Sequence, residues 1–547
     1  MSFNSNFIPG VTSLLASSAL LLGCQSKEEI RNSPPNILFA ISDDQSYPHA
    51  SAYGADFVDT PAFDLVAENG ILFNNAFAAA PQCSPSRAAI LTGRNIWQLE
   101  EAGTHGSMFP AKFPVFTDAL ERKGYFIGYT GKAWAPGNWM DAGWERNPVG
   151  PEYNMHFFDE VPYSGLSNRD YAANFASFME EKPEGKPFFF WFGAHEPHRR
   201  YEYGSGVMEG KNPDRLVVPP FLADHEIVRN DVLDYAVEIE WFDTQLQKML
   251  AWLEAAGELE NTIVVVTSDN GMPFPYAKAN LQDLGTHVPL AISGPGVHHR
   301  GRVVDDLVSL IDMAPTFLEI AGVDHFDGIT GRSLFPIFQS DRQGFVDVNR
   351  EFVLTGRERH THARPDNVGY PSRSIRTRDY LYVKNFKPDR WPAGNPPPEV
   401  RMPLPERNYK EIVLGFEDID DSPTKEVMIT NKHLWPELFR IGFEKRPEAQ
   451  LYHMPSDPWS VNDLSGDPEY AGIMRELDRK LMELLKEQKD PRVTGKGDVF
   501  ESYPRFGLMR LFPGFSERGA YNPAFLDRDA FDPAFIERTG FEYQEEE

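Results

Sequence analysis

Cysteine is scarce in this chain, and basic residues are outnumbered. Only two of the 547 residues are Cys, and with His scattered along the sequence they predict no zinc site. The 53 Lys and Arg against 81 Asp and Glu give a formal net charge of -28, which argues against nucleic acid as a partner. After residue 24, no stretch approaches the about 18 consecutive apolar residues of a membrane span. The body of the protein is therefore predicted to be soluble, and its 41% hydrophobic content is expected to form the cores of two domains.

The first 24 residues are typical of an export signal. An apolar run rich in small residues, Val11 to Leu20, precedes Leu21-Leu22-Gly23-Cys24, which resembles a bacterial lipoprotein signal peptide with its lipobox. This predicts a signal peptide at 1–24, lipidation of Cys24, and a polar linker at 25–35. The protein is then expected in the periplasm or at the cell surface, touching the membrane only through a lipid anchor. Residues 1–10 contain no Lys or Arg, so a plain cleaved signal or an inaccurate start codon stays open.

Three apolar runs predict buried strands that each end at polar, titratable residues. The runs are Asn36–Ile41, Pro187–Phe192 and Thr262–Thr267. A short helix that opens at Thr60-Pro61 and closes at Gly70 follows the first run. Helices after strands indicate an open α/β sheet with a site at the carboxyl edge of its strands. The side chains delivered to that edge include Asp43, Asp44, His195, His198, Asp269 and Asn270.

Beyond about residue 345 the pattern changes. Residues 380–383 alternate like a half-exposed strand, and 394–405 form a proline-rich loop. A helix is predicted over 469–489, capped by Asp467-Pro468, with Ile473, Leu477, Leu481 and Leu484 on one face. The chain is therefore divided into a main domain at 36–345, a smaller α+β domain at 346–512, and a surface tail at 513–547.

The stretch Cys83-Ser84-Pro85-Ser86-Arg87, followed by Leu91-Thr92-Gly93-Arg94, carries the most information. Ser84 and Pro85 predict the cap and first turn of a helix. Cys83 would then lie at a positive helix end, which favours an anionic ligand such as sulfate. Arg87, one turn further in, could direct a fork of donors at the same group. The alternative is an ordinary buried Cys before a capped helix.

Two pairs of residues at strand ends offer hard oxygen ligands. Asp43 with Asp44, and Asp269 with Asn270, supply carboxylate and amide oxygens, which favour Ca²⁺ or Mg²⁺ over zinc or copper. An isolated Asp-Asp pair is more often a solvated turn. The combination with Cys83 is what indicates a metal site.

Together these motifs resemble those of the formylglycine-dependent sulfatases, relatives of alkaline phosphatase. The resemblance runs from Asn36 to about Asp490. It implies an alkaline-phosphatase-like mixed sheet flanked by helices, and oxidation of Cys83 to Cα-formylglycine by a formylglycine-generating maturation enzyme. Within the family, Pro197-His198-Arg199 and the stretch from Ser268 to Pro289 are most similar to heparan N-sulfatase and to bacterial polysaccharide sulfatases.

The resemblance also implies a mechanism. A hydrated aldehyde carries two hydroxyls on one carbon: one attacks sulfur, with Asp269 as the base, and the other later expels sulfate. Charge on the sulfate oxygens would be neutralised by three cations, and His198 would protonate the leaving oxygen or nitrogen. The implied catalytic residues are Cys83, Arg87, Lys132, His198, Asp269 and Lys278. The implied ligands of Ca²⁺, with Mg²⁺ as the alternative, are Asp43, Asp44, residue 83, Asp269 and Asn270.

One position departs from the family pattern. Gly131-Lys132-Ala133-Trp134 stands where many sulfatases have Gly-Lys-x-His, so another group must orient the hydroxyl of residue 83, and His105 is a candidate. Further substrate contacts are predicted at Arg199 and at a basic cluster in the second domain, which would hold a second sulfate or a uronate carboxylate. The alternative is that these charges are satisfied at the domain interface. The cluster comprises Arg357, His360, His362, Arg364 and Arg373.

The predicted function is removal of sulfate from a sulfated carbohydrate, either an algal polysaccharide or a glycosaminoglycan oligosaccharide. An N-sulfoglucosamine sulfohydrolase and a phosphoester or phosphonate hydrolase of the same superfamily are the enzyme alternatives. A glycan-binding surface lipoprotein with an inactive site is the alternative from another class.

Overall fold

The structure is a computed structural model that describes residues 1–2, 34–396 and 415–506. The predicted signal peptide with Cys24, most of the linker, part of the loop at 394–405 and the surface tail at 513–547 lie outside these residues. Among the residues described, no helix has both the length and the apolar character of a membrane span.

A mixed eight-stranded sheet forms the centre of the main domain. Its strands follow the order β3-β4-β1-β5-β6-β2-β7, and β8 pairs with β2. The first four are neighbours and run parallel, while β6 is antiparallel to both β5 and β2. The strands are β1 (Asn36–Ser42), β2 (Gly70–Phe77), β3 (Phe126–Gly131), β4 (Phe188–Gly193), β5 (Thr262–Ser268), β6 (His287–Ser293), β7 (Arg302–Val304) and β8 (Val308–Ser309).

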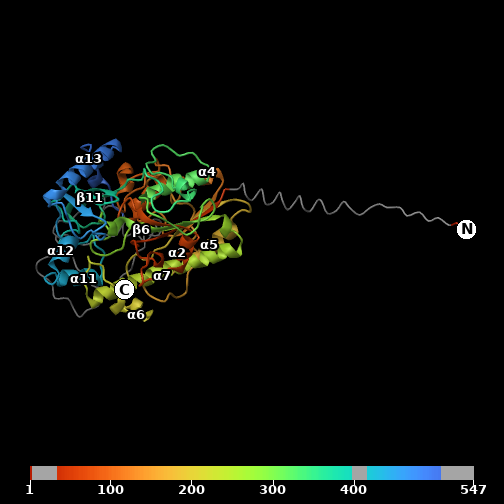
Figure 1. Cartoon of the computed structure of the whole chain (residues 1–547), viewed down its shortest axis with the longest axis horizontal. Helices are drawn as coiled ribbons and strands as arrows, with labels where there is room; N and C mark the ends of the chain where they lie inside the picture. The colour runs from red at the N-terminus through yellow and green to blue at the C-terminus, as the bar shows by residue number, and fades with distance from the viewer. Residues whose placement is uncertain (3–33, 397–414, 507–547) are drawn as a thin grey trace.

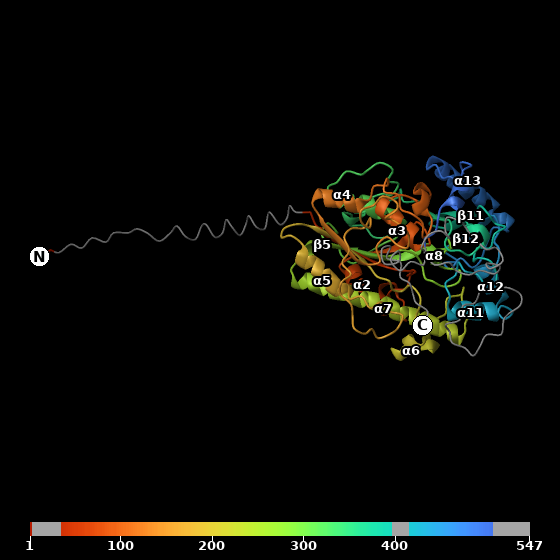
Figure 2. The same cartoon turned by 180° about the vertical axis from the view of Figure 1, so that it is seen from behind.

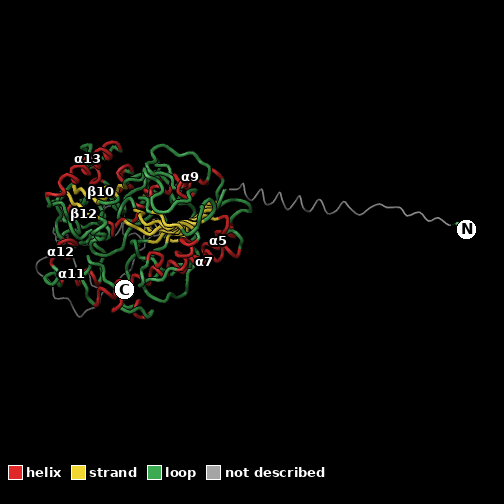
Figure 3. The backbone as a smooth tube through the Cα atoms, viewed as in Figure 1, coloured by secondary structure: helices red, strands yellow, loops and turns green. Residues whose placement is uncertain are grey.

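The apolar strands predicted from the sequence are buried on both faces of this sheet. In β1, Ile37 and Phe39 pack into one core while Leu38 and Ala40 pack into another, because successive side chains point to opposite faces. Helices cover both faces, with α9 on one side and α5 and α7 on the other in Figure 3. The helices are α2 (Pro61–Glu68), α3 (Cys83–Thr92), α4 (Phe116–Lys123), α5 (Tyr171–Glu181), α6 (Ser205–Met208), α7 (Glu226–Ala255), α8 (Asp283–Thr286), α9 (Met313–Ile320) and α10 (Phe335–Phe338).

A second, four-stranded antiparallel sheet follows in the chain, with the order β12-β11-β10-β9. The predicted helix over 469–489 is α13, which buries Leu477, Leu481 and Leu485. Asp467 caps the short 3₁₀ turn that leads into it. Figures 1 and 2 show these elements gathered at one end of the molecule. They are β9 (Phe352–Arg357), β10 (Ser372–Thr377), β11 (Tyr380–Asn385), α11 (Pro423–Thr430), α12 (Pro436–Phe443), β12 (Ala449–His453), α13 (Ala471–Glu487) and α14 (Val499–Ser502).

The fold prediction is thus confirmed: a mixed sheet flanked by helices, with a smaller C-terminal α+β domain. The boundary near residue 345 stays a prediction. The two parts are tied together by polar contacts, including the ion pair of Arg376 on β10 with Asp283 on α8 at 3.1 Å. Near the end of the described chain, the amide of Phe506 donates to the carbonyl of Gly106, in the loop beside the start of α3.

Candidate active site

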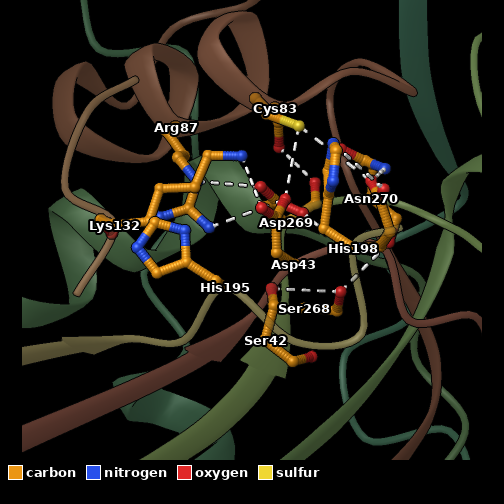
Figure 4. Close-up of polar contacts among 12 residues, drawn as sticks. Ser42, Asp43, Cys83, Arg87, Lys132, His195, His198, Ser268, Asp269 and Asn270 are labelled. Carbon is orange, nitrogen blue, oxygen red and sulfur yellow. Dashed lines mark hydrogen bonds and ion pairs between the residues drawn. The ribbon is translucent and has the colours of Figure 1, made fainter. Parts of the chain in front are cut away.

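Four neighbouring parallel strands deliver the polar residues to one edge of the sheet. Asp43 follows β1, Lys132 follows β3, His195 follows β4 and Asp269 follows β5. The register aligns Ile41 with Gly193, and Gly193 with Gly131, so these strands end at one level. Figure 4 shows their side chains converging with Cys83. The prediction of a site at the carboxyl edge of the sheet agrees with this arrangement.

Cys83 is the first residue of α3, and the whole helix is buried. The prediction that Ser84 caps the helix was wrong, because the cap position is Gln82, without a side-chain cap. The hydroxyl of Ser84 instead accepts a hydrogen bond from the amide of Gly106 at 3.0 Å. The Cys83 thiol, which marks the place of a formylglycine side chain, lies 3.3 Å from Asp43 Oδ1 and 3.9 Å from Asp44 Oδ1.

Three buried carboxylates each pair with a buried cation around Cys83. Lys132 Nζ lies 2.5 Å from Asp43 Oδ2, and Lys278 Nζ lies 2.6 Å from Asp44 Oδ2. Arg87 Nε donates to Asp269 Oδ2 at 2.8 Å. Two carbonyls, of residues 132 and 133, hold Arg87 Nη1. Arg87 Nη2 is buried without a hydrogen-bond partner among the described residues and lies 3.9 Å from Asp43 Oδ1, so its N–H groups can still donate to an anion beside Cys83.

The donor set fits a divalent cation with oxygen ligands. Ligand atoms of Asp43, Asp44, Cys83 and Asp269 all lie within 4.8 Å of one another. Asn270 donates its amide to Asp44 Oδ1 at 2.6 Å, while its own Oδ1 is buried and accepts no hydrogen bond from the described residues. A buried amide oxygen without a donor is costly unless a ligand satisfies it. A cluster of carboxylate and amide oxygens of this kind favours Ca²⁺ or Mg²⁺ as the bound ion.

The electrostatics of the site support the same conclusion. Burial would raise the pKa of Asp43, but the positive charges of Lys132, Arg87 and Lys278, with that of His198 when it is protonated, hold it well below its usual range. Burial raises the pKa of Asp44 to about 6, and burial with repulsion from Asp43 raises that of Asp269 to about 7. Burial therefore disfavours the ionised forms of Asp44 and Asp269, and a dication would favour them.

The Cys83 thiol itself is unsuited to nucleophilic attack. Burial raises its pKa well above the ordinary value, and the charge of Asp43 adds to this effect. The thiolate is the nucleophilic form of cysteine. An unmodified Cys83 would therefore contribute little to catalysis, and the site is better suited to a different side chain at this position.

His198 is the partly exposed member of the site. Its side chain is 36% exposed, whereas that of Asp44, 3.8 Å from its Nε2, is fully buried. The backbone carbonyl of Arg199 lies 2.7 Å from His198 Nδ1, so the imidazole presents Nε2 to the site. A nitrogen of His198 also lies within 4.8 Å of the Cys83 sulfur.

Trp134 and His105 are both buried and contact other groups of the protein. Trp134 is buried, packs on Phe109, and donates its indole N–H to the carbonyl of Ser84 at 3.0 Å, which supports the first turn of α3. His105 is also buried, with Nδ1 3.0 Å from the carbonyl of His360. The geometry favours His198 over His105 as the group nearest to residue 83, and a direct role for His105 stays a prediction.

The remaining predicted substrate residues are buried and engaged with protein groups. Arg199 forms a bidentate pair with Asp231 at 2.7 and 2.8 Å. Arg357 and Arg364 both donate to Asp418 Oδ2, at 2.8 and 2.5 Å. These contacts favour the interface alternative, and substrate binding by the cluster stays a prediction. The other members also have protein partners: His360 near Asp418, His362 beside Arg505, and Arg373 with Glu358 and Asp490.

Sequence reasoning left two residues of the site unassigned. Figure 4 draws His195 among the residues of the site, and Arg169 Nη1 is 3.1 Å from its Nε2. Its place after a buried strand assigned it to this edge of the sheet, but no motif gave it a role. Asp420 lies 3.0 Å from Lys278 Nζ. It comes from the C-terminal domain, where no strand-end pattern marks it.

Comparison with known protein families accounts for this geometry. The family model described as "Sulfatase" matches residues 35–323, more than half of the chain. The chain belongs to the sulfatase family. It is therefore a sulfuric ester hydrolase, and its family generally uses a formylglycine and a divalent metal. A second model, described as the C-terminal part of N-sulphoglucosamine sulphohydrolase, matches residues 275–391 of this sulfatase.

Individual relatives cover most of this sulfatase. Human N-sulphoglucosamine sulphohydrolase is 27% identical over 86% of this chain and 94% of its own length. An ulvan-active sulfatase of Formosa agariphila is 26% identical, with 85% and 84% covered. Among solved structures, a protein in complex with D-glucosamine-2-N,6-O-disulfate matches with a TM-score of 0.59 at 20% identity, covering 84% of this chain and 99% of that one. The phosphonate monoester hydrolase of Agrobacterium radiobacter shares the fold, with a TM-score of 0.54 at 17% identity and 84% and 97% covered.

Proposed function

We propose that the protein removes sulfate from a sulfated carbohydrate after a maturation enzyme has converted Cys83 to Cα-formylglycine. The observation that carries the proposal is the position of Cys83, at the start of a buried helix within 3.9 Å of two carboxylates and beside the available donor of Arg87. The names of the relatives support a carbohydrate: they act on N-sulphoglucosamine and on ulvan.

Two groups supply the chemistry that the twenty amino acids lack. A hydrated formylglycine at position 83 would carry two hydroxyl groups on one carbon. One would attack sulfur, and the other would lose its proton when sulfate is released. A divalent ion, Ca²⁺ or alternatively Mg²⁺, supplies Lewis acidity when bound by Asp43, Asp44, Asp269, Asn270 and residue 83.

The chain's own residues bind and orient the sulfate group. Arg87 Nη2, Lys132 and Lys278 are positively charged donors around residue 83, so they stabilise negative charge on the sulfate oxygens. Asp269, held by Arg87, is the proposed base for the attacking hydroxyl. His198, oriented by the carbonyl of Arg199, directs Nε2 to the leaving oxygen or nitrogen. Burial and the charge of Lys278 lower its pKa to about 4, so it is the proposed proton donor in its imidazolium form.

The substrate class is tested by desulfation of defined oligosaccharides. Purified protein would be incubated with O-sulfated and N-sulfated glycosaminoglycan fragments, with ulvan oligosaccharides, and with a matched pair of aryl sulfate and aryl phosphonate. Release of inorganic sulfate from one of the carbohydrates supports the proposal. Faster turnover of the phosphonate would instead favour a phosphonate hydrolase, and binding without turnover would favour a glycan-binding lipoprotein.

We further propose export to the periplasm or cell surface, with lipidation at Cys24. The apolar run before Leu21-Leu22-Gly23-Cys24 supports it. Replacement of Cys24 by Ser should release the protein from the membrane fraction of its host, as measured by fractionation. An unchanged distribution would contradict the anchor.

A further inference from the structure

We propose that Asp420 is a positioning residue through which the C-terminal domain holds the ammonium of Lys278 in the active site. Lys278 Nζ lies between two carboxylates, 2.6 Å from Asp44 Oδ2 and 3.0 Å from Asp420 Oδ2. The three side chains are at most 6% exposed. The inference rests on the proposed function, in which Lys278 contacts the sulfate group.

The surroundings of Asp420 exclude a simpler role as a metal ligand. Ligand atoms of Asp44, His198 and Asp420 lie within 4.8 Å of one another, which could suggest a second cation site. The ammonium of Lys278 already lies between Asp44 and Asp420 and supplies the positive charge there. Asp420 is therefore the counter-charge of a lysine rather than part of the metal cluster.

The need for this counter-charge follows from the proposed ligand set. If Asp44 binds a divalent ion, it shares its negative charge with that ion, and Lys278 is left beside a dication. Like charges at such separations repel strongly in a buried site. Asp420 approaches Lys278 from the C-terminal domain, outside the proposed ligand set, so it keeps an attractive partner for the ammonium in place.

The segment around Asp420 is held firmly enough to serve this purpose. Asp418, two residues earlier, accepts hydrogen bonds from Arg357, Arg364 and the amide of Thr361. On the other side, Lys425 donates to the carbonyl of Ile419 at 3.0 Å. The buried cluster that the sequence suggested for substrate thus anchors the loop that carries Asp420.

The backbone around Lys278 is also constrained. Tyr276 and Ala279 have φ angles of 71° and 61°, in the left-handed region that residues other than glycine rarely adopt. The amide of Lys278 donates to the carbonyl of Met272 at 3.0 Å, and that of Ala279 to Pro81 at 2.8 Å. Both ends of the Lys278–Asp420 contact are therefore held in fixed positions.

A double-mutant cycle tests whether Asp420 acts through Lys278. Asp420→Asn should lower kcat/KM for sulfate release by about 10- to 100-fold, and Lys278→Met by more. If the two residues act as a unit, the double variant should equal Lys278→Met within about threefold. Asp420→Glu should recover part of the loss. Asp389→Asn, a control at an exposed carboxylate of the same domain, should stay within about twofold of wild type.

A binding measurement provides a second readout that needs no turnover. Inorganic sulfate should raise the unfolding temperature of the wild type and of Asp389→Asn equally. The rise should be smaller for Asp420→Asn, and Lys278→Met should show none. The inference would be overturned if the double variant lost kcat/KM by the product of the two single losses. An equal sulfate-induced rise of the unfolding temperature in Asp420→Asn and wild type would also overturn it. So would the lack of any sulfate-induced shift in the wild type. If the wild type releases no sulfate from any substrate, the proposed function fails, and the sulfate-induced shifts alone decide the role of Asp420.

Discussion

The free energy of unfolding of the metal-free protein should fall as the pH rises, because the buried carboxyl of Asp269 loses its proton. Burial, with repulsion from Asp43, raises the pKa of this carboxyl from 3.8 to about 7. Between about pH 4 and pH 7 the folded protein then holds a proton that the unfolded chain has released, so the free energy of unfolding falls as the pH rises through this window. A difference of about 3 pKa units corresponds to about 4 kcal/mol.

The comparison of wild type with Asp269→Asn isolates this effect. Both proteins would be stripped of divalent ions with a chelator and unfolded in denaturant at pH 5, 6, 7 and 8. The variant removes the titrating group and also leaves Arg87 without its partner, which changes its stability by an amount nearly independent of pH. The loss of stability from pH 5 to pH 8 should be smaller in the variant by roughly 2–3 kcal/mol, because part of the full effect lies below pH 5. An Asp59→Asn control, at an exposed position, should follow the wild type.

In the wild type, added Ca²⁺ should oppose the fall of the free energy of unfolding with rising pH, because Ca²⁺ binding requires ionised carboxylates. The stabilisation by Ca²⁺ should therefore be larger at pH 8 than at pH 5. Parallel pH profiles for wild type and Asp269→Asn without metal would refute the account of Asp269. So would Ca²⁺ stabilisation that is greater at pH 5.

Three further substitutions have expected outcomes. Arg87→Lys should lower kcat/KM by about 10²- to 10³-fold in a sulfate-release assay, because it removes a directed donor to the sulfate oxygens. Trp134→Phe should lower the free energy of unfolding by about 1 kcal/mol, through the lost hydrogen bond to Ser84, and leave kcat within about threefold. Arg199→Met should cost about 3–5 kcal/mol by leaving Asp231 buried without its partner, and the double variant with Asp231→Leu should recover part of that loss in denaturant unfolding.

Each of these outcomes separates two roles. Near-normal turnover by Arg87→Lys would show that the fork of donors is dispensable. A large loss of kcat in Trp134→Phe would mean that the indole acts in catalysis rather than in support of α3. Stability close to wild type in Arg199→Met, combined with a raised KM, would restore Arg199 as a substrate-binding residue.

The strand ends were predictable because their signal is local. An apolar run followed by Asp43-Asp44 or Asp269-Asn270 identifies both a buried strand and its polar end. Parallel pairing then brings such ends together, as the register of β1 with β5 shows by aligning Ser42 with Ser268. The α/β fold class and the residues at the strand ends therefore followed from patterns of about ten residues each, whereas Lys132 and Lys278 entered only through the resemblance to the sulfatases.

The errors and omissions concern contacts between distant segments. Ser84 fits a helix cap by its residue type, yet its hydroxyl is taken by the amide of Gly106, and no local pattern reveals that loop. For the basic cluster the choice between an anion site and an interface stayed open, because the sequence does not show that Asp418 lies beside both Arg357 and Arg364. Asp420 was missed for the same reason. Burial of charge depends on partners that only the tertiary structure brings together.

The most direct test is the chemical state of residue 83 together with its activity. In protein produced with a maturation enzyme, the peptide containing residue 83 should be lighter by about 18 Da than the thiol form. Sulfate release should rise in proportion to the converted fraction and vanish in Cys83→Ala. Full turnover by protein that retains the free thiol, or by Cys83→Ala, would contradict the account.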